Sequence, residues 1–508
     1  MSKDAPRTLI DDLLAEQRTL TAVERFAQKH ERHELPAQAQ YYRDLIPLNK
    51  PLAGEQYAFA VNLDTCTGCK ACVSACHSMN GLDEDESWRS VGLLLGGTRR
   101  EPWQQTVTSA CHHCEDPACA NGCPVLAYEK DEETGIVRHL DDQCIGCQYC
   151  VLKCPYDVPK YSEKRGIVRK CDMCQGRLAA GEAPACVQAC PNEAIRIEVV
   201  KTGASSDERM LPGTFESSYT RPTTSYRSSA TLPTNARPGD SGDLRLEHAH
   251  WPLIAMLAFT QAAAGTYAAA VALPQLAIPA TVLLHIGLAV SVLHLGRPLG
   301  AWRFFLGLRK SWMSREILAF SVLAGAGVAF TGATYLGWEF ARPLGLATVF
   351  FGAIAIACSA MIYVDTQRPW WSAAATFGKF FGSTIVLGLH AAAIATSSPI
   401  VLAVTVAAHW SLVGWETRRN QRALEDEEHP AHRPARIASL LMRGITELRI
   451  SAVLLSAVCA AFAFTTTGRW PSIIAAVLAF TAVIAERTIF FTAACAPRMP
   501  GIPARARY

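Results

Sequence analysis

The chain has 508 residues, half of them hydrophobic, and a formal net charge of +3 at pH 7. This length allows two or three domains with sizeable cores, and the near-neutral charge gives no electrostatic basis for binding nucleic acid. Sixteen of the nineteen cysteines lie between Cys66 and Cys190, whereas long apolar runs begin only after residue 251. The sequence therefore predicts a soluble, cysteine-dense front half and a membrane-embedded back half.

Residues 1–50 form a polar N-terminal extension. Within it, LIDDLLAEQRTLTAVERFAQ has helical periodicity and predicts a surface or docking helix. The start of the chain lacks the apolar region of a secretory signal, so we expect the cysteines to meet a reducing cytosol. There, metal or cluster ligation is favoured over disulfides.

Residues 51–199 contain four groups of four closely spaced cysteines. The first group, CTGCKACVSACH, has the spacing C-x2-C-x2-C-x3-C, with His77 where bacterial ferredoxins have proline. The other three groups end in Cys-Pro. In chain order, the groups are Cys66, Cys69, Cys72 and Cys76; Cys111, Cys114, Cys119 and Cys123; Cys144, Cys147, Cys150 and Cys154; and Cys171, Cys174, Cys186 and Cys190.

Sixteen thiolates provide the ligands of four [4Fe–4S] clusters with none left over. Zinc is the alternative, because paired C-x2-C knuckles also bind it tetrahedrally. Zinc does not need a third close cysteine followed by a more distant fourth, and this spacing favours clusters. His112 and His113 could replace thiolates as ligands, but each group is complete without them. We expect these two residues to lie behind the ligands or at the surface.

Residues 200–247 are rich in Ser, Thr, Pro and Gly, show no hydrophobic period and predict an irregular linker. Residues 248–508 then predict a membrane anchor of eight helices, each near bilayer-spanning length. The fifth and sixth apolar runs are separated by little more than TSSP, so a re-entrant pair is an alternative there. The eight runs lie near 252–273, 276–296, 316–337, 344–364, 378–397, 399–415, 450–466 and 471–492.

The basic residues between these runs predict the orientation of the anchor. Seventeen Lys and Arg residues lie on the side shared with the cysteine-rich half, against two, Arg342 and Arg469, on the opposite side. We therefore expect the chain in the cytoplasmic membrane, with its cysteine-rich half in the cytoplasm. The seventeen are Arg297, Arg303, Arg309, Lys310, Arg315, Arg368, Lys379, Arg418, Arg419, Arg422, Arg433, Arg436, Arg443, Arg449, Arg498, Arg505 and Arg507.

Ionisable residues within the membrane are costly and mark candidate functional sites. His294 ends the second run and Glu316 opens the third, across a short basic loop that contains Arg297. A histidine and a carboxylate suit a quinone, which needs a hydrogen-bond partner and a route for protons. The alternative is structural: His294 caps backbone carbonyls, and Glu316 pairs with Arg315 or Arg297.

Other residues within the apolar runs have alternative interpretations. His285, His390 and His409 are also intramembrane, and two facing histidines could ligate haem b. Cys358, Cys459 and Cys495 are expected to pack as small apolar residues.

Residues 57–199 resemble the four-cluster electron-transfer subunit of the dimethyl sulfoxide reductase family of molybdoenzymes. The matching motifs are CTGCKAC…WRSVG, CHHCEDPAC…CP, CIGCQYCVLKCPY and RKCDMCQGRLAAGEAPACVQACP. The back half resembles the eight-helix anchor of that family in EHAHWPLIAMLAFTQ, SVLHLGRPLGAWRFF and SWMSREILAF. In the family these are separate chains, so their fusion here is a departure. The resemblance implies an α+β bi-ferredoxin-like domain with four [4Fe–4S] clusters, followed by an all-α eight-helix transmembrane bundle.

The resemblance also implies which cysteines share a cluster. In the family the first pair of clusters faces the catalytic subunit and the last faces the membrane. Cysteine at position 147, where nitrate reductase relatives have tryptophan and a three-iron cluster, implies four irons here. The implied ligand sets are Cys66, Cys69, Cys72 and Cys190; Cys76, Cys171, Cys174 and Cys186; Cys111, Cys114, Cys119 and Cys154; and Cys123, Cys144, Cys147 and Cys150.

The function implied is that of an electron-transfer and membrane-anchor subunit. It would connect the quinone pool, bound near His294, Glu316 and Arg297, with a cytoplasmic catalytic subunit that contains molybdopterin. This anchor type carries no haem, so none is expected. A second hypothesis is a cytoplasm-facing sulfite dehydrogenase that reduces quinone. A third is a conformationally coupled membrane module, which would need a buried charged path, and we find little for one beyond His285, His390 and His409.

Overall fold

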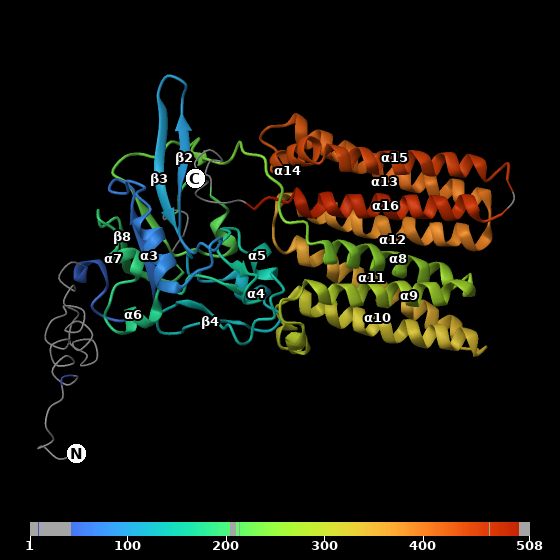
Figure 1. Cartoon of the computed structure of the whole chain (residues 1–508), viewed down its shortest axis with the longest axis horizontal. Helices are drawn as coiled ribbons and strands as arrows, with labels where there is room; N and C mark the ends of the chain where they lie inside the picture. Colours follow the sequence, from blue (N-terminus) through green and yellow to red (C-terminus); the bar gives the residue numbers. More distant parts are fainter. Residues whose placement is uncertain (1–8, 10–41, 204–209, 213, 467, 497–508) are drawn as a thin grey trace, which may run out of the picture.

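The computed structural model describes Leu9 and residues 42–203, 210–212, 214–466 and 468–496. A mixed α/β unit contains the cysteine-rich half, and a bundle of long helices contains the apolar half (Figure 1). This arrangement confirms the predicted fold class. The helix expected in LIDDLLAEQRTLTAVERFAQ lies, apart from Leu9, outside the described residues, as do the basic residues of the C-terminal tail.

Short sheets form the framework of the front half. In the first sheet, β1 pairs antiparallel with β8 and parallel with β9; in the second, β2 pairs with β3 and β10. Two further hairpins pair β4 with β5 and β6 with β7. The strands are β1 (Glu55–Asn62), β2 (Ser90–Gly97), β3 (Pro102–Ser109), β4 (Tyr128–Lys130), β5 (Val137–His139), β6 (Lys160–Ser162), β7 (Ile167–Arg169), β8 (Ile195–Lys201), β9 (Ser225–Arg227) and β10 (Arg237–Pro238).

Short helices begin within or beside the cysteine groups and position their thiols. Two 3-10 turns, η2 and η3, belong to the same half. These elements are η2 (Arg43–Leu45), α3 (Ala71–Asn80), α4 (Ala118–Gly122), α5 (Tyr149–Lys153), α6 (Gln175–Ala179), α7 (Ala185–Gln188) and η3 (Ser217–Tyr219).

The absence of proline after the first cysteine group lengthens α3. Helices α4 and α5 end immediately before Cys123 and Cys154, which are extended because each precedes a proline. Helix α3 instead continues for one turn past Cys76. His77, which occupies the proline position, places its Nε2 atom 3.1 Å from the carbonyl oxygen of Asp83. His77 thus permits the longer helix and ties it to the following loop.

The segment 200–247 is not a free linker, which corrects the sequence-based expectation. Its described residues supply β9 and β10, so they complete both three-stranded sheets. The Thr223 hydroxyl also donates to the carbonyl oxygen of His112 at 2.8 Å. The sequence did not predict these strands, because each has only two or three residues and lies in a polar segment.

Among the described residues of the back half, eight helices are long and apolar enough to cross a membrane. The fifth and sixth runs form two separate helices of 24 and 27 residues rather than a re-entrant pair. The spanning helices are α8 (Trp251–Ala270), α9 (Ala277–Ser291, within the apolar segment Pro274–His294), α10 (Trp312–Tyr335), α11 (Ala341–Val364), α12 (Ala373–Thr396), α13 (Pro399–Glu425), α15 (Arg443–Phe462) and α16 (Trp470–Thr492).

Shorter elements connect these helices. Proline near the start of α8, α13 and α16 has no backbone N–H to leave unpaired, and Ser398 caps α13 by accepting from the Val401 amide. The connecting elements are η4 (Pro274–Leu276), η5 (Val292–His294), η6 (Pro298–Gly307), η7 (Pro369–Trp371), α14 (His432–Arg436) and a π-helical turn, Ile437–Leu441.

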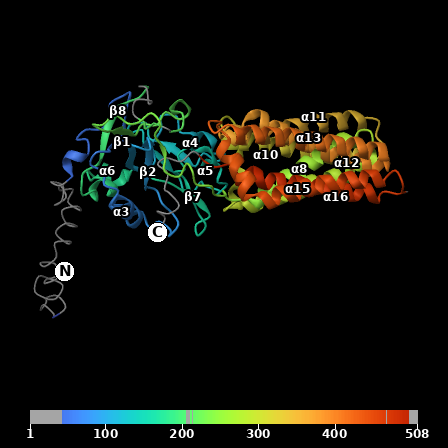
Figure 2. The same cartoon turned by 90° about the horizontal axis from the view of Figure 1, so that it is seen from above.

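Close contact between two backbones fixes the centre of the bundle. A Cβ atom added to Gly265 of α8 would lie 2.0 Å from the carbonyl oxygen of Thr384, and one added to Gly388 of α12 would lie 2.4 Å from that of Gly265. Small residues allow such approach, which supplies packing energy where lipid provides no hydrophobic drive. Figure 2 shows the bundle and the front half arranged end to end.

Candidate functional site

The sixteen cysteines of the front half gather into four sets, and each set draws on two of the sequence groups. The four thiols of the first set line one hollow, and those of the third set line another. Within the second set and within the fourth, the thiols lie close enough to raise one another's pKa. The first set is Cys66, Cys69, Cys72 and Cys190; the second Cys76, Cys171, Cys174 and Cys186; the third Cys111, Cys114, Cys119 and Cys154; and the fourth Cys123, Cys144, Cys147 and Cys150. These are the sets that the resemblance implies.

The chemistry of the donor sets fits iron–sulfur clusters. Burial raises the pKa of Cys76 to about 12, with a further contribution from Cys186, and it raises the pKa of Cys174 to about 11. Four adjacent thiols can ionise together only if bound positive charge compensates their burial and mutual repulsion. No carboxylate lines the hollows of the first and third sets, so these hollows offer the soft donors that cluster iron prefers. Within the described residues, no three His, Cys, Asp or Glu side chains lie close enough to hold a single metal ion.

Two buried cations lie between the thiol sets, and sequence reasoning missed both. Arg89 is 2% exposed; burial lowers its pKa, but the thiolates of the first two sets outweigh this effect and raise it. Lys170 donates to the carbonyl oxygen of Cys171 at 2.7 Å and lies 3.6 Å from the Cys111 sulfur. Each cation thus offsets negative charge from two sets. The one sequence signal for Arg89 and Lys170 was their position, because both lie inside the motifs quoted above for the family resemblance.

The two adjacent histidines are buried behind the thiols rather than at the surface. His112 lines the hollow of the third set and packs edge-to-face on Tyr156, with ring centroids 4.4 Å apart. Burial lowers the pKa of His112 to about 3, so the ring is neutral. The Val137 amide donates to the His113 Nδ1 atom at 3.1 Å, so that ring supports a strand end.

The fourth thiol set opens onto a pocket of about 350 Å³ between the front half and the bundle. Cys147 belongs to the lining of this pocket, together with His294 and Glu316. Two of the three quinone residues predicted from the sequence, His294 and Glu316, are therefore brought together beside a predicted cluster ligand. The remaining walls are mainly apolar and include Leu253, Met256, Trp302, Phe304, Met313, Phe320, Ile362 and Tyr363.

The hydrogen bond of His294 identifies which of its ring nitrogens carries the hydrogen. Its Nδ1 atom contacts the Ser291 carbonyl oxygen, which can only accept, so Nδ1 carries the hydrogen. The Nε2 atom is buried without a partner within the described residues. In the neutral ring, Nε2 is therefore an acceptor available to a hydroxyl group in the pocket.

The other two candidate quinone residues have different surroundings. Glu316 is 6% exposed, lines the pocket from the second turn of α10 and lies beside the Ser359 hydroxyl. Arg297 does not line the pocket; its guanidinium donates to the Asp141 carbonyl oxygen at 2.8 Å. The structure thus gives Arg297 a role in joining the two halves rather than in the pocket.

The segment η6 joins the front half to the bundle beside the pocket. Arg303 donates to the Asp142 carbonyl oxygen at 3.0 Å, and the Gly307 amide donates to that of Pro124 at 2.9 Å. The outer face of η6, including Leu299 and Trp302, is exposed, as expected for a segment lying at a membrane surface.

A second joint is centred on Asp365, just beyond the end of α11. Lys153 forms an ion pair with its carboxylate at 2.6 Å, and the Tyr149 hydroxyl lies 3.3 Å from the same oxygen. The Tyr219 hydroxyl donates to the Asp365 backbone carbonyl at 2.8 Å. Burial lowers the pKa of Lys153, and the neighbouring Asp365 carboxylate opposes this effect.

The bundle also contains buried ion pairs that sequence reasoning overlooked. Lys379 lies 2.7 Å from Glu486, whose other oxygen contacts Arg487, and Arg449 lies 2.7 Å from Glu416. The buried charges of the bundle are therefore not limited to His285, His390 and His409, beyond which the sequence offered little for a charged path. Lys379 and Arg449, counted above as loop charges, lie inside the bundle.

The three intramembrane histidines differ in environment. His285 is exposed on the outer surface of α9 and donates within its own helix to the Thr281 carbonyl oxygen at 2.8 Å. His390 and His409 are buried and contact each other edge-to-face, with ring centroids 6.0 Å apart. Cys459 and Cys495 pack against apolar clusters, as expected.

Comparison with known proteins gives matches for both halves. Residues 103–200 match the 4Fe-4S dicluster domain, and residues 249–492 match the DMSO reductase anchor subunit (DmsC). The sequence is 42% identical over 148 residues to the B subunit of the anaerobic dimethyl sulfoxide reductase of Escherichia coli K12, and the match covers 28% of this protein and 72% of that subunit.

More distant similarity extends to other iron–sulfur proteins. The sequence is 33% identical over 171 residues to the formate dehydrogenase-O iron-sulfur subunit of Escherichia coli K12, covering 30% and 57% of the two proteins. It is 32% identical over 173 residues to the hydrogenase-2 operon protein HybA of Escherichia coli O157:H7, covering 29% and 53%. With its iron–sulfur half and its anchor half both matched, the protein belongs to the dimethyl sulfoxide reductase family, as an iron–sulfur electron-transfer subunit fused to a DMSO reductase-type membrane anchor.

Proposed function

We propose that this chain carries electrons between the quinone pool and a molybdopterin-containing catalytic subunit on the cytoplasmic side of the membrane. The observation that carries the proposal is the shared lining of one pocket by Cys147, His294 and Glu316. A quinol bound there would have a proton acceptor and an electron acceptor within the same cavity.

The four thiol sets would each hold one [4Fe–4S] cluster, and each cluster supplies a site for one electron when bound. Neighbouring sets are linked by buried side chains: Arg89 lies between the first and second, and Lys170 between the second and third. Tyr128 interacts with cysteines of the third and fourth sets. The sets thus follow one another in a row that ends at the membrane pocket.

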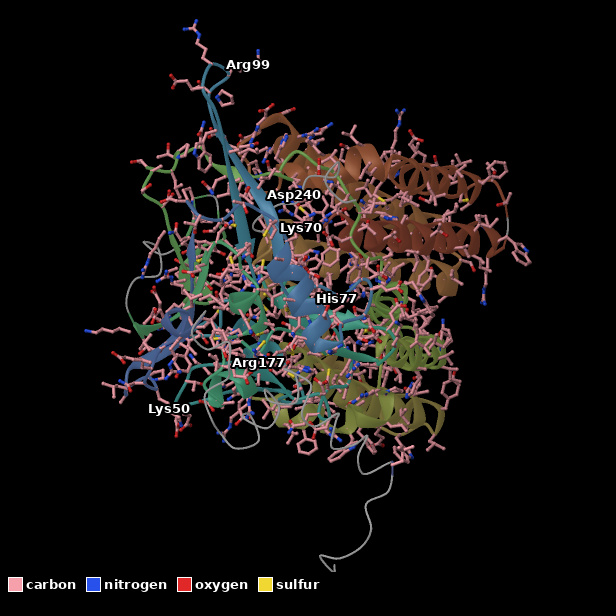
Figure 3. The ribbon with its side chains drawn as sticks, turned by 60° about the vertical axis from the view of Figure 1, so that its left-hand side comes forward. Lys50, Lys70, His77, Arg99, Arg177 and Asp240 are labelled. Carbon is pink, nitrogen blue, oxygen red and sulfur yellow. The ribbon has the colours of Figure 1, made fainter. Side chains whose placement is uncertain are left out.

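The opposite end of the row reaches the surface of the front half. Cys69 of the first set is exposed, and Lys70 lines the same hollow. Figure 3 shows Lys70, just before α3, and His77, within it, on the side of the front half turned away from the bundle, and Arg99 at the tip of the β2–β3 hairpin, which projects above this side. This side is where a catalytic subunit would dock.

In the pocket, the side chains of the protein would handle the protons. Oxidation of a quinol releases two electrons and two protons; the electrons leave one at a time through the fourth set. The free Nε2 atom of His294 would accept one hydroxyl proton, and Glu316 is placed to accept the other when ionised.

The test compares two histidines that stand on the same apolar segment. In membranes containing the full chain and its catalytic partner, His294→Gln should slow cluster reduction by an added quinol roughly a hundredfold, because the amide cannot take a proton. His285→Gln, on the outer surface of the bundle, should retain the wild-type rate. Equal rates for all three proteins would contradict the assignment, and so would an iron content well below about sixteen atoms per chain.

The same membranes test the direction of electron flow. We take it to run from quinol to the catalytic subunit, because the matched anchor and the matched iron–sulfur subunit are both named for dimethyl sulfoxide reductase. Dimethyl sulfoxide should then reoxidise the quinol-reduced clusters. Reduction of quinone by sulfite in these membranes would establish the reverse direction.

A further inference from the structure

One face of α13 carries a basic hollow that belongs to neither the thiol sets nor the quinone pocket. The hollow has a volume of about 720 Å³. Its lining follows two ridges of the helix at a spacing of four residues, and His429 from the following loop closes it. The ridges are Trp410, Gly414, Arg418 and Arg422, and Ser411, Trp415 and Arg419.

Two of the three arginines of this hollow carry charges that no ion pair neutralises within the described residues. Arg418 and Arg422 are exposed, and no ion pair involves either of them within the described residues. Arg419 donates one hydrogen bond to the Ser372 hydroxyl at 2.8 Å. The acidic run 425–428 follows closely in sequence, but none of its four carboxylates lines the hollow.

The hollow lies where α13 leaves the membrane. The helix has 27 residues and is about 40 Å long, whereas the hydrocarbon core is about 30 Å thick. Counted from Pro399 at the opposite side, Trp415 stands at about 24 Å, and Arg418 and Arg422 stand at about 28 and 34 Å. The indole rings therefore face acyl chains, and the guanidinium groups lie at the level of the headgroups.

We propose that this hollow binds an anionic phospholipid of the leaflet nearest the iron–sulfur half. Guanidinium groups bind phosphate oxygens in paired hydrogen bonds, and Arg418 and Arg422 lie one helical turn apart on one ridge. Trp415 supplies an amphipathic surface for the upper acyl region beneath the arginines, and Trp410, about 16 Å from Pro399, lines the deeper acyl region. The positive-inside rule by itself requires only that arginines lie in the loop. Here a cavity with aromatic walls also lies beneath the arginines, and the rule does not require such a cavity.

The site is separate from electron transfer. In Figure 1, α13 and α15 lie on the opposite side of the bundle from α9 and α10, which border the quinone pocket. Lipid binding here can therefore be tested without regard to the proposed function.

The experiment uses the full-length protein, purified and stripped of lipid in detergent. Native mass spectrometry with added phosphatidylglycerol should show binding to the wild type that is roughly twentyfold tighter than to Arg418→Gln/Arg422→Gln, since each arginine contributes a charged contact to the phosphate. The matched control is Arg309→Gln/Lys310→Gln, which removes two exposed charges from another loop on the same side. This control should bind like the wild type.

Two further additives separate the sources of phosphate. Phosphatidylcholine and inorganic phosphate should bind at least tenfold more weakly to the wild type than phosphatidylglycerol does. Equal binding of phosphatidylglycerol by the wild type and the Arg418/Arg422 variant would overturn the proposal. Equal binding of inorganic phosphate and phosphatidylglycerol by the wild type would also overturn it, in favour of a simple anion site.

Discussion

At the scale of single residues, the buried charges between thiol sets determine how easily an electron is accepted. Lys170 contacts the Cys111 sulfur and the Cys171 carbonyl, so its charge acts on the second and third sets together. A positive charge in a low-dielectric interior stabilises a reduced, more negative cluster. Such a residue can set a potential without ligating iron.

Replacing Lys170 tests this role. Lys170→Met should lower the reduction potentials of the second and third clusters and affect those of the first and fourth less, because electrostatic effects decline with distance. Redox titration followed by electron paramagnetic resonance would measure the shifts. Lys170→Arg should restore most of the wild-type values, and Lys164→Met, at a side chain 73% exposed, should change none. Unchanged potentials in Lys170→Met would exclude the role.

The sequence predicted the ligands better than it predicted their surroundings. Cysteine spacing marks the sixteen thiols as candidate cluster ligands, and the resemblance to the dimethyl sulfoxide reductase family implies how they divide into four sets. Arg89 and Lys170 have no spacing rule, because each reaches two thiol sets from outside the cysteine groups, Arg89 just before β2 and Lys170 just after β7. His77 also needed the structure: only the extra turn of α3 shows what replaces proline.

At the scale of helices, the close approach of α8 and α12 depends on glycine. A methyl group on Gly265 would meet the Thr384 carbonyl oxygen at 2.0 Å, so the helices must separate. Gly265→Ala should therefore destabilise the bundle by about 1–3 kcal/mol. The measurement is the thermal unfolding midpoint in detergent. Gly332→Ala, where a Cβ atom meets nothing within 4 Å, should leave that midpoint unchanged or raise it.

The ion pairs of α12 and α16 provide a second test at this scale. Glu486 contacts both Lys379 and Arg487, so Glu486→Gln would leave excess positive charge inside the bundle. Loss of a partner from a buried ion pair costs about 3–5 kcal/mol. Thermal unfolding should show a clearly lowered midpoint, whereas Glu447→Gln, which breaks the exposed Arg443–Glu447 pair, should not. Equal midpoints would mean that water enters the cluster and solvates its charges.

Hydropathy found all eight helices but not these charges. A window of apolar residues tolerates one or two ionisable side chains, so Lys379, Glu486 and Arg487 left the runs intact. Their pairing joins helices that are distant in sequence, and no local pattern records it. The hydrogen bonds from Arg487 to Gln261 and Ser383, at 2.8 and 3.2 Å, show the same dependence on tertiary contact.

At the scale of the whole molecule, the distribution of basic residues makes a testable prediction of the orientation in the membrane. The positive-inside rule predicts that the iron–sulfur half lies in the cytoplasm, although two of the seventeen charges are internal. A specific protease site inserted at Gly337, in the α10–α11 turn, should be cut in intact spheroplasts. The same site inserted at Glu427, beyond α13, should be cut only in inverted vesicles. The reverse pattern would place the thiol sets outside.

The segment that completes both sheets of the front half continues without a break into the first membrane helix, and the Glu247 amide donates to the Thr492 carbonyl oxygen at the junction. Covalent tethering by a short connection gives two partners an effective concentration in the millimolar range. The contacts around Asp365 and η6 therefore need not have the affinity that two freely diffusing proteins would require. They need only choose one alignment among those the tether permits, so they can remain polar and few without loss of assembly at low expression.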